Sequence, residues 1–165
     1  MSEGYGIFMI LEAGFAQTPD EVARKMMQVA RLQSGEVLYD LGSGDGTLLI
    51  LAATEFGARA VGVEIQKKFV TYTWKKVREL GLENQITVIN EDFFKVNIGE
   101  ANVVVLYLTP RVLERLKLKL EKELSHGTRI VVYRYPIEGL IPKKVYDIIE
   151  ERQKTQIFLY ESIGK

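Results

Sequence analysis

One stretch of the sequence decides the fold: Asp40-Leu41-Gly42-Ser43-Gly44-Asp45-Gly46. It ends a short apolar run at 37–41, which predicts a buried strand, and it precedes an apolar run at 47–56, which predicts a helix. Glycines in such a loop let the backbone approach a ligand closely, and the free N–H groups at the helix start attract an anionic group. The stretch therefore predicts a ligand site at the carboxyl end of a strand.

The same alternation of strand and helix continues on both sides of this loop. Further strands are expected at 59–64, 86–90, 103–108 and 128–135, and helices at 18–32, 67–80 and 109–124. Thr18 is expected to cap the first helix, with Pro19 at its first position and Glu21 closing a capping box. The last two strands, 145–153 and 156–163, read as a hairpin with a tight turn at Lys154-Thr155. The pattern predicts an α/β fold with helices on both faces of a mostly parallel, seven-stranded sheet that ends in an antiparallel hairpin.

The glycine loop differs from two common phosphate-binding motifs. No Gly-Lys-Ser/Thr follows it, so it is not a P-loop, and Thr47 stands where a dinucleotide-binding loop has its third glycine. A carboxylate at Asp40 also disfavours a pyrophosphate. The loop instead suits a ligand that carries an ammonium or sulfonium group.

Two more strand ends carry acids. Glu64 ends the second strand, 18 residues beyond Gly46, where a carboxylate can accept two hydrogen bonds from a ribose diol. After the third strand, Asp92 can accept a hydrogen bond from an exocyclic adenine amine, and Phe93 can pack on the ring. A cationic group, a ribose and an adenine are the three features of S-adenosylmethionine.

On these residues the chain resembles the class I S-adenosylmethionine-dependent methyltransferases, which have a Rossmann-like fold. The motifs are Asp40–Gly46, Gly62-Val63-Glu64 and Glu91-Asp92-Phe93, in this order. More narrowly, Thr18-Pro19 and Val104-Val105-Leu106-Tyr107-Leu108 resemble the small archaeal protein-lysine methyltransferases and their mitochondrial relatives. Phe15 stands where those enzymes tend to have tyrosine, which puts a substrate-orienting hydroxyl there in doubt.

The resemblance implies methyl transfer from S-adenosylmethionine to lysine side chains of proteins, with loose specificity. The residues expected at the cofactor are Thr18, Asp40, Gly42, Ser43, Gly44, Gly46, Glu64, Ile65, Asp92 and Phe93. Those expected to be catalytic are Tyr107 and Thr109, and those expected at the substrate are Phe15, Leu108 and Tyr133, with Tyr135 as a further candidate for closing the pocket. Residues 1–17, irregular and apolar, are expected to form a lid within a single domain of residues 1–165.

Composition narrows the alternatives. There is no cysteine, and the one histidine, His126, has no partner cluster, so no metal site is expected. Lys and Arg number 22, as do Asp and Glu, which disfavours stable nucleic-acid binding. The chain is expected to be a cytoplasmic monomer with no membrane segment. The resemblance, rather than the composition, implies an archaeal source and exposed protein lysines as substrates. Two rivals stay open, namely the same chemistry on RNA or a small molecule, and a non-catalytic subunit that only binds the cofactor.

Overall fold

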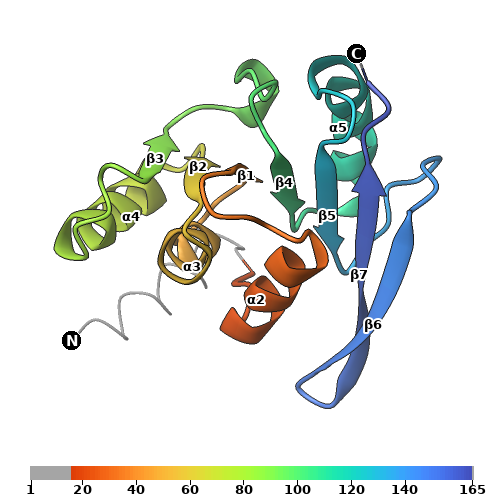
Figure 1. Ribbon diagram of the computed structural model, residues 1–165, viewed down its shortest axis with the longest axis horizontal. Coiled ribbons are helices and arrows are strands. Elements are labelled where there is room, and N and C mark those ends of the chain that lie inside the picture. Colours follow the sequence, from red (N-terminus) through yellow and green to blue (C-terminus); the bar gives the residue numbers. More distant parts are fainter. Residues whose placement is uncertain (1–15, 165) are drawn as a thin grey trace.

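The computed structural model describes residues 16–164. Its helices and strands follow one another as the sequence pattern predicts (Figure 1). Their bounds in chain order are α2 (Asp20–Val29), β1 (Val37–Leu41), α3 (Thr47–Phe56), β2 (Arg59–Val63), α4 (Lys67–Glu79), β3 (Ile86–Ile89), the 3-10 turn η1 (Phe93–Lys95), β4 (Val103–Leu106), α5 (Pro110–Glu123), β5 (Arg129–Tyr133), β6 (Lys144–Glu150) and β7 (Gln153–Glu161).

The strands form one seven-stranded sheet in the order β3-β2-β1-β4-β5-β7-β6. The five strands from β3 to β5 in this order run parallel to one another, and β7 is antiparallel to both β5 and β6. This confirms the predicted sheet and its C-terminal hairpin. The strand order reverses between β1 and β4, and the crevice at the carboxyl ends of such a pair is where ligands bind in open α/β sheets.

A hydrophobic core lies on each face of the sheet, because side chains alternate along a strand. In β4, Val103 and Val105 belong to one core, and Val104 and Leu106 to the other. Helices α2, α3 and α4 cover the first core, and α5 covers the second. The helices therefore lie on both faces, as predicted.

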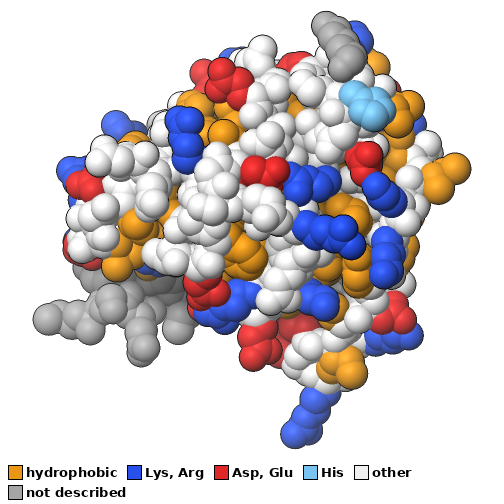
Figure 2. Space-filling model, in the orientation of Figure 1, with side chains coloured by type: hydrophobic (Ala, Val, Ile, Leu, Met, Phe, Trp, Pro, Cys, Tyr) orange, Lys and Arg blue, Asp and Glu red, His pale blue; other side chains and the backbone are white. Residues whose placement is uncertain are grey.

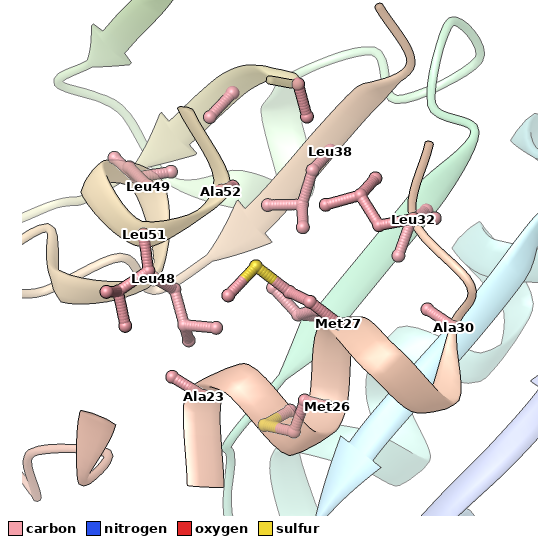
Figure 3. Packing of buried hydrophobic residues seen from close by; sticks show 14 of the residues in the cluster. Ala23, Met26, Met27, Ala30, Leu32, Leu38, Leu48, Leu49, Leu51 and Ala52 are labelled. Atoms are coloured by element: carbon pink, nitrogen blue, oxygen red, sulfur yellow. The ribbon is translucent and has the colours of Figure 1, made fainter. Parts of the chain in front are cut away.

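The first core fixes the position of β1 and thus of the glycine loop. Met26 and Met27 of α2 have no exposed surface and share this core with Leu38 of β1, which lies beside Met27 (Figure 3). Leu48 and Leu49, at the start of α3, belong to the same core. Burying a side chain of this size stabilises the fold by about 1.5–3 kcal/mol. The loop from Asp40 to Gly46 is therefore held between two firmly packed elements.

The first helix differs from the prediction at both ends. Its N-cap is Pro19 and no side chain caps it, so the expected capping box of Thr18 and Glu21 is wrong; the Thr18 side chain is buried instead. The helix ends at Val29 rather than at Leu32 because Arg31 takes a positive φ of 51°. The amides of Arg31 and Leu32 then bond back to the carbonyls of Gln28 and Met27, which closes a Schellman motif.

The predicted hairpin turn is also wrong, by three residues. Glu150 pairs with Gln153, so the turn is Glu151-Arg152, while Lys154 and Thr155 lie inside β7 opposite β6. Both turn residues have positive φ, 46° and 66°, as a two-residue hairpin loop of type I′ requires. The usual sequence signal for that turn is Asn-Gly or Asp-Gly, which this chain lacks here.

Within residues 16–164, no helix is long and apolar enough to cross a membrane. In the same part of the chain, no three His, Asp or Glu side chains come together in a way that could hold a metal ion.

Candidate functional site

The loop after β1 is folded back against β2 and α4. The amides of Gly42 and Ser43 both donate to the carbonyl of Val63, at 2.8 and 3.1 Å. Thr73 of α4 donates from its hydroxyl to the Gly44 carbonyl at 3.2 Å. A Cβ on Gly46, whose φ is 79°, would come within 2.4 Å of the Thr73 side chain. Only glycine fits at this position, so the loop shape depends on it.

Side-chain and backbone atoms of Glu64 together connect the glycine loop, the residues after β2 and the residue after β3. It accepts from the backbone amide of Gly44 at 2.9 Å and from that of Gln66 at 2.8 Å. Asn90, just after β3, donates from its side chain to the carbonyls of Glu64 and Ile65 at 2.9 and 3.0 Å. A carboxylate offers about four acceptor sites, so two remain for a ligand.

A cavity of about 460 Å³ opens at the carboxyl ends of the strands, beside this loop. Its volume lies in the range of about 300–1,000 Å³ that small-molecule sites occupy. The residues that line it are Ala16, Thr18, Asp40, Gly42, Ser43, Asp45, Thr47, Leu48, Glu64, Gln66, Tyr107, Leu108, Thr109, Val112, Arg134 and Tyr135.

Two buried polar side chains of this cavity, Asp40 and Ser43, could interact with a ligand. Asp40 is almost fully buried, and burial raises the pKa of its carboxyl to about 8, with the nearby Glu64 and Asp45 carboxylates as further causes. The hydroxyl of Ser43 is buried and forms no hydrogen bond within residues 16–164. A cationic ligand would restore the charge of Asp40, because an opposite charge favours the ionised form of a carboxyl. The site thus fits the ammonium and sulfonium groups of S-adenosylmethionine.

Tyr107 and Arg134 line the cavity, and the buried ring of Tyr133 packs beneath them. The ring of Tyr107 lies 4.7 Å from that of Tyr133, tilted by 60°. Arg134 lies over both rings, 5.7 Å from the centroid of Tyr107 and 5.6 Å from that of Tyr133. Burial raises the pKa of Tyr107 above its usual value of 10.0, so its hydroxyl stays protonated at neutral pH.

The structure brings many of the predicted site residues to this cavity. β4 ends at Leu106 rather than at Leu108, which leaves the next three residues in the connection to α5. Thr109 is the N-cap of α5, but its hydroxyl makes no capping bond. The predicted residues that line the cavity are Thr18, Asp40, Gly42, Ser43, Glu64, Tyr107, Leu108 and Thr109.

The other predicted residues lie elsewhere. Gly44 and Gly46 shape the loop without lining the cavity. Tyr133 has no exposed surface and lies in the first core, beneath Tyr107. Ile65 is 66% exposed. Phe15 falls outside the described residues.

Asp92 and Phe93 follow β3 and do not line the cavity. Asp92 accepts from the amide of Phe94 at 2.9 Å and so caps the turn η1. Phe93 packs against the second core, with the Phe94 ring 4.9 Å away. One carboxylate oxygen of Asp92 makes the capping bond, and the other makes no hydrogen bond within the described part of the chain.

Sequence reasoning assigned no site role to seven residues of the cavity wall. Two of them, Asp45 and Gln66, adjoin predicted site positions. Ala16, Thr47, Leu48 and Val112 carry no chemical signal of their own. Arg134 directly follows β5, and ligands bind at the carboxyl ends of the strands in such sheets, so this position could have been predicted.

The sheet order, the glycine loop and the acidic cavity define a class I S-adenosylmethionine-dependent methyltransferase. A solved structure supports this directly: an RNA methyltransferase from Salinibacter ruber in complex with S-adenosyl-L-homocysteine. The two chains are 34% identical, with a TM-score of 0.85, and the match covers 91% of this chain and 95% of that one. S-adenosylmethionine is therefore the methyl donor.

The family follows from two further similarities. A model of the ANTKMT methyltransferase domain matches residues 40–144, and the chain belongs to this family of methyltransferases. A protein-lysine N-methyltransferase from Saccharolobus islandicus is 37% identical over 147 residues, 88% of this chain and 91% of that protein. An adenine nucleotide translocase lysine N-methyltransferase from Mus musculus is 31% identical over 83% of this chain, but the match spans only 64% of its own length.

Proposed function

We propose that this enzyme transfers a methyl group from S-adenosylmethionine to lysine side chains of proteins, with loose specificity. The observation that carries the lysine assignment is the similarity to the Saccharolobus islandicus protein-lysine methyltransferase over 91% of its length. The Mus musculus relative also acts on a lysine by its name, although the match spans 64% of that protein. The non-catalytic alternative is disfavoured, because the acids and glycines of the cofactor motif are all present.

In the proposed arrangement, the strand ends hold the cofactor. Asp40 and Ser43 face its cationic amino-acid end, and the loop glycines let the backbone lie close to it. The two free acceptor sites of Glu64 bind the ribose diol. The free oxygen of Asp92 accepts from the adenine amine, and Phe93 packs on the adenine ring. Thr18 and Ile65 lie next to the two ends of the cofactor. Two observations support this arrangement: the pKa of the buried Asp40 carboxyl is raised to about 8, and the Ser43 hydroxyl has no hydrogen-bond partner within residues 16–164.

The acceptor lysine enters past Tyr107, Leu108 and Thr109. When bound, the cofactor supplies the electrophilic methyl group, and the protein supplies alignment. Lysine has an unperturbed pKa of about 10.4, so its ammonium must lose a proton before it can attack. Tyr107 keeps its own proton, because its pKa is raised, and therefore orients the amine rather than acting as a base.

We also propose that residues 1–17 form a lid of the single domain. Ala16 and Thr18 line the cavity, and Gln17 donates from its side chain to Asp45 at 2.9 Å. The end of this segment therefore already reaches the site. Deleting residues 2–15 should reduce lysine methylation, and unchanged methylation would refute the lid.

RNA is the second candidate substrate, because the Salinibacter ruber protein is named an RNA methyltransferase and is 34% identical. Acidic and basic side chains are intermixed on the face shown in Figure 2, which does not favour binding of an RNA backbone on that face.

We also propose that the protein is a monomer, that it is cytoplasmic and that its source is archaeal. Gel filtration tests the monomeric state.

The experiment is incubation of the purified enzyme with cofactor labelled on the methyl group and a mixed lysate of protein and RNA. Mass spectrometry then locates the label. Label on lysine supports the proposal, whereas label on RNA or small metabolites alone rejects it. The matched pair of variants is Asp40→Asn, which should lose the label, and Asp147→Asn, an exposed acid of β6 that should keep it.

A further inference from the structure

Arg134 stands just beyond β5 in a conformation that arginine rarely takes. Its φ is 75°, and the amide of Tyr135 donates to the carbonyl of Tyr133 at 3.0 Å, across a single residue. A three-residue γ-turn with positive φ at its centre is rare and strained. The amide of Arg134 donates to the Gln156 carbonyl on β7 at 2.8 Å, so the sheet holds the turn. Strain that the surrounding structure maintains points to a function for the residue.

The turn places a permanent positive charge in the cavity wall. Among the described residues that line the cavity, Arg134 is the only lysine or arginine. Its guanidinium covers the rings of Tyr107 and Tyr133, and one of its nitrogens lies 3.6 Å from the Glu150 carboxylate on β6. Aromatic faces attract cations. Of these two rings, that of Tyr107 lines the cavity, and the guanidinium lies over it where an ammonium would otherwise bind.

We propose that Arg134 is a specificity-determining residue that admits the acceptor lysine as a neutral amine. The inference rests on the proposed lysine substrate. Two effects act in the same direction: the guanidinium occupies the position over the Tyr107 ring that would stabilise an ammonium, and its charge repels an ammonium nearby. Neither effect penalises the uncharged amine, which is the nucleophile.

The proton and electron balance is simple. The lysine ammonium releases its proton to water as it enters, which leaves a lone pair on the nitrogen. That pair forms the new N–CH₃ bond while the bond between the methyl carbon and sulfur breaks and its electrons stay on sulfur. The product is a methylated ammonium, which again carries a positive charge beside Arg134.

Other charged groups face the same space and oppose this effect. Asp40, Asp45 and Glu64 line the cavity, and Glu150 faces Arg134 from β6. Glu64 is engaged by two backbone amides, and Asp45 by Gln17 and the Thr47 amide. Asp40 faces the cationic end of the cofactor in the proposed arrangement.

Glu150 is the acid that directly offsets Arg134. Removing its charge should therefore strengthen the effect of Arg134. Tyr107 and Tyr135 also line this wall and are uncharged as phenols.

The test is the pH dependence of kcat, at saturating cofactor, with a protein that the lysate experiment has shown to be labelled on lysine. Arg134→Gly removes the charge, and glycine takes positive φ without steric cost, so the turn is kept. Arg134 lies 5.7 Å from the Tyr107 ring centroid, and we take a similar distance to an amine bound beside that ring. With an effective dielectric constant between those of a protein surface and of water, one charge at this distance shifts the pKa of the amine by about one unit. In Arg134→Gly, the acid limb of the kcat profile should therefore lie about one pH unit higher than in the wild type. At pH values below this limb, kcat should be roughly tenfold lower than in the wild type.

Three further variants make the result specific. Arg134→Lys keeps the charge and should keep the limb. Glu150→Gln should move the limb to lower pH, which a merely structural role would not do. Arg152→Gly is the matched control, since Arg152 also has positive φ, 66°, but lies in the exposed hairpin turn and should change nothing.

Cofactor affinity, measured by calorimetry, should stay the same in Arg134→Gly. An equal loss of rate at every pH, or an unmoved limb, would overturn the role of Arg134 while leaving the lysine substrate intact. If the wild-type enzyme labels no lysine at any pH, the proposed function fails and this inference fails with it.

Discussion

Asp40 should destabilise the cofactor-free enzyme, and replacing it with asparagine should therefore make the protein more stable. Burial, aided by Glu64 and Asp45, raises the pKa of the Asp40 carboxyl from 3.8 to about 8. A raised pKa means that the folded state binds this proton more tightly than the unfolded state does. Stability is then full below pH 3.8 and falls as the pH rises towards 8.

The size of the effect follows from the pKa difference. Each pH unit in this interval costs about 1.4 kcal/mol of unfolding free energy. Neutral pH lies about three units above the unfolded pKa, so the cost at pH 7 is about 4 kcal/mol. Asparagine has nearly the shape of the protonated acid and carries no charge, so Asp40→Asn should recover most of this energy.

The assay is denaturant unfolding of the cofactor-free wild type and of Asp40→Asn between pH 5 and pH 9. The stability difference should grow with pH and level off above about 8. Asp147→Asn is the control: that acid is exposed, and its side-chain hydrogen bonds with Gln156 and Lys154 lower its pKa, so no such growth is expected. Calorimetry should show the opposite effect on binding, with a cofactor Kd raised on the order of 10- to 100-fold.

One result would refute this reasoning. If Asp40→Asn is no more stable than the wild type at pH 7, and the difference stays flat with pH, Asp40 is not held as a buried acid. Unchanged cofactor affinity in the same variant would separately exclude Asp40 from the cofactor site.

Three further substitutions test the surroundings of the cavity. Gly62→Ala should destabilise the protein by about 1–3 kcal/mol in denaturant unfolding, because its Cβ would lie 2.5 Å from Leu49 and 2.6 Å from the Ser43 hydroxyl; an unchanged midpoint would contradict this. Tyr107→Phe keeps the ring and should lower kcat less than about tenfold without moving its pH profile; loss of the acid limb would instead make the hydroxyl a base. Tyr133→Phe should be neutral or stabilising, by up to about 1 kcal/mol, because the buried Tyr133 hydroxyl has no hydrogen-bond partner in residues 16–164; a large loss of stability would reveal one.

The sequence predicts the parts of the site that depend on strand ends. Asp40 and Glu64 can be found because parallel strands bring their carboxyl ends to one edge of the sheet. The glycine loop between them is equally visible, because its conformation needs glycine at Gly46. These features are local in the chain and follow from periodicity and residue type.

The missed features depend on backbone conformations that carry no residue signal. Strict alternation puts Tyr133 and Tyr135 on the same face of β5, which makes both of them candidates for the pocket. The γ-turn at Arg134 breaks the alternation, so Tyr133 stays in the core while Tyr135 lines the cavity. Arg31 and the hairpin turn Glu151-Arg152 likewise take positive φ without glycine. Contacts between segments far apart in the sequence impose these conformations, so they cannot be predicted from residue types in a single sequence.

The carboxylate of Glu64 has a consequence for how this site can change in evolution. It faces the cavity, and it also accepts the amides of Gly44 and Gln66. A mutation that removes the Glu64 carboxylate would leave these two backbone amides without an acceptor, at a cost of about 1–3 kcal/mol each. A lineage that no longer used the cofactor would still be under selection to retain this acid, for the sake of its fold alone. Persistence of Glu64 in a descendant is therefore weak evidence that the descendant still catalyses the reaction, whereas Asp40, which costs stability, would be free to drift.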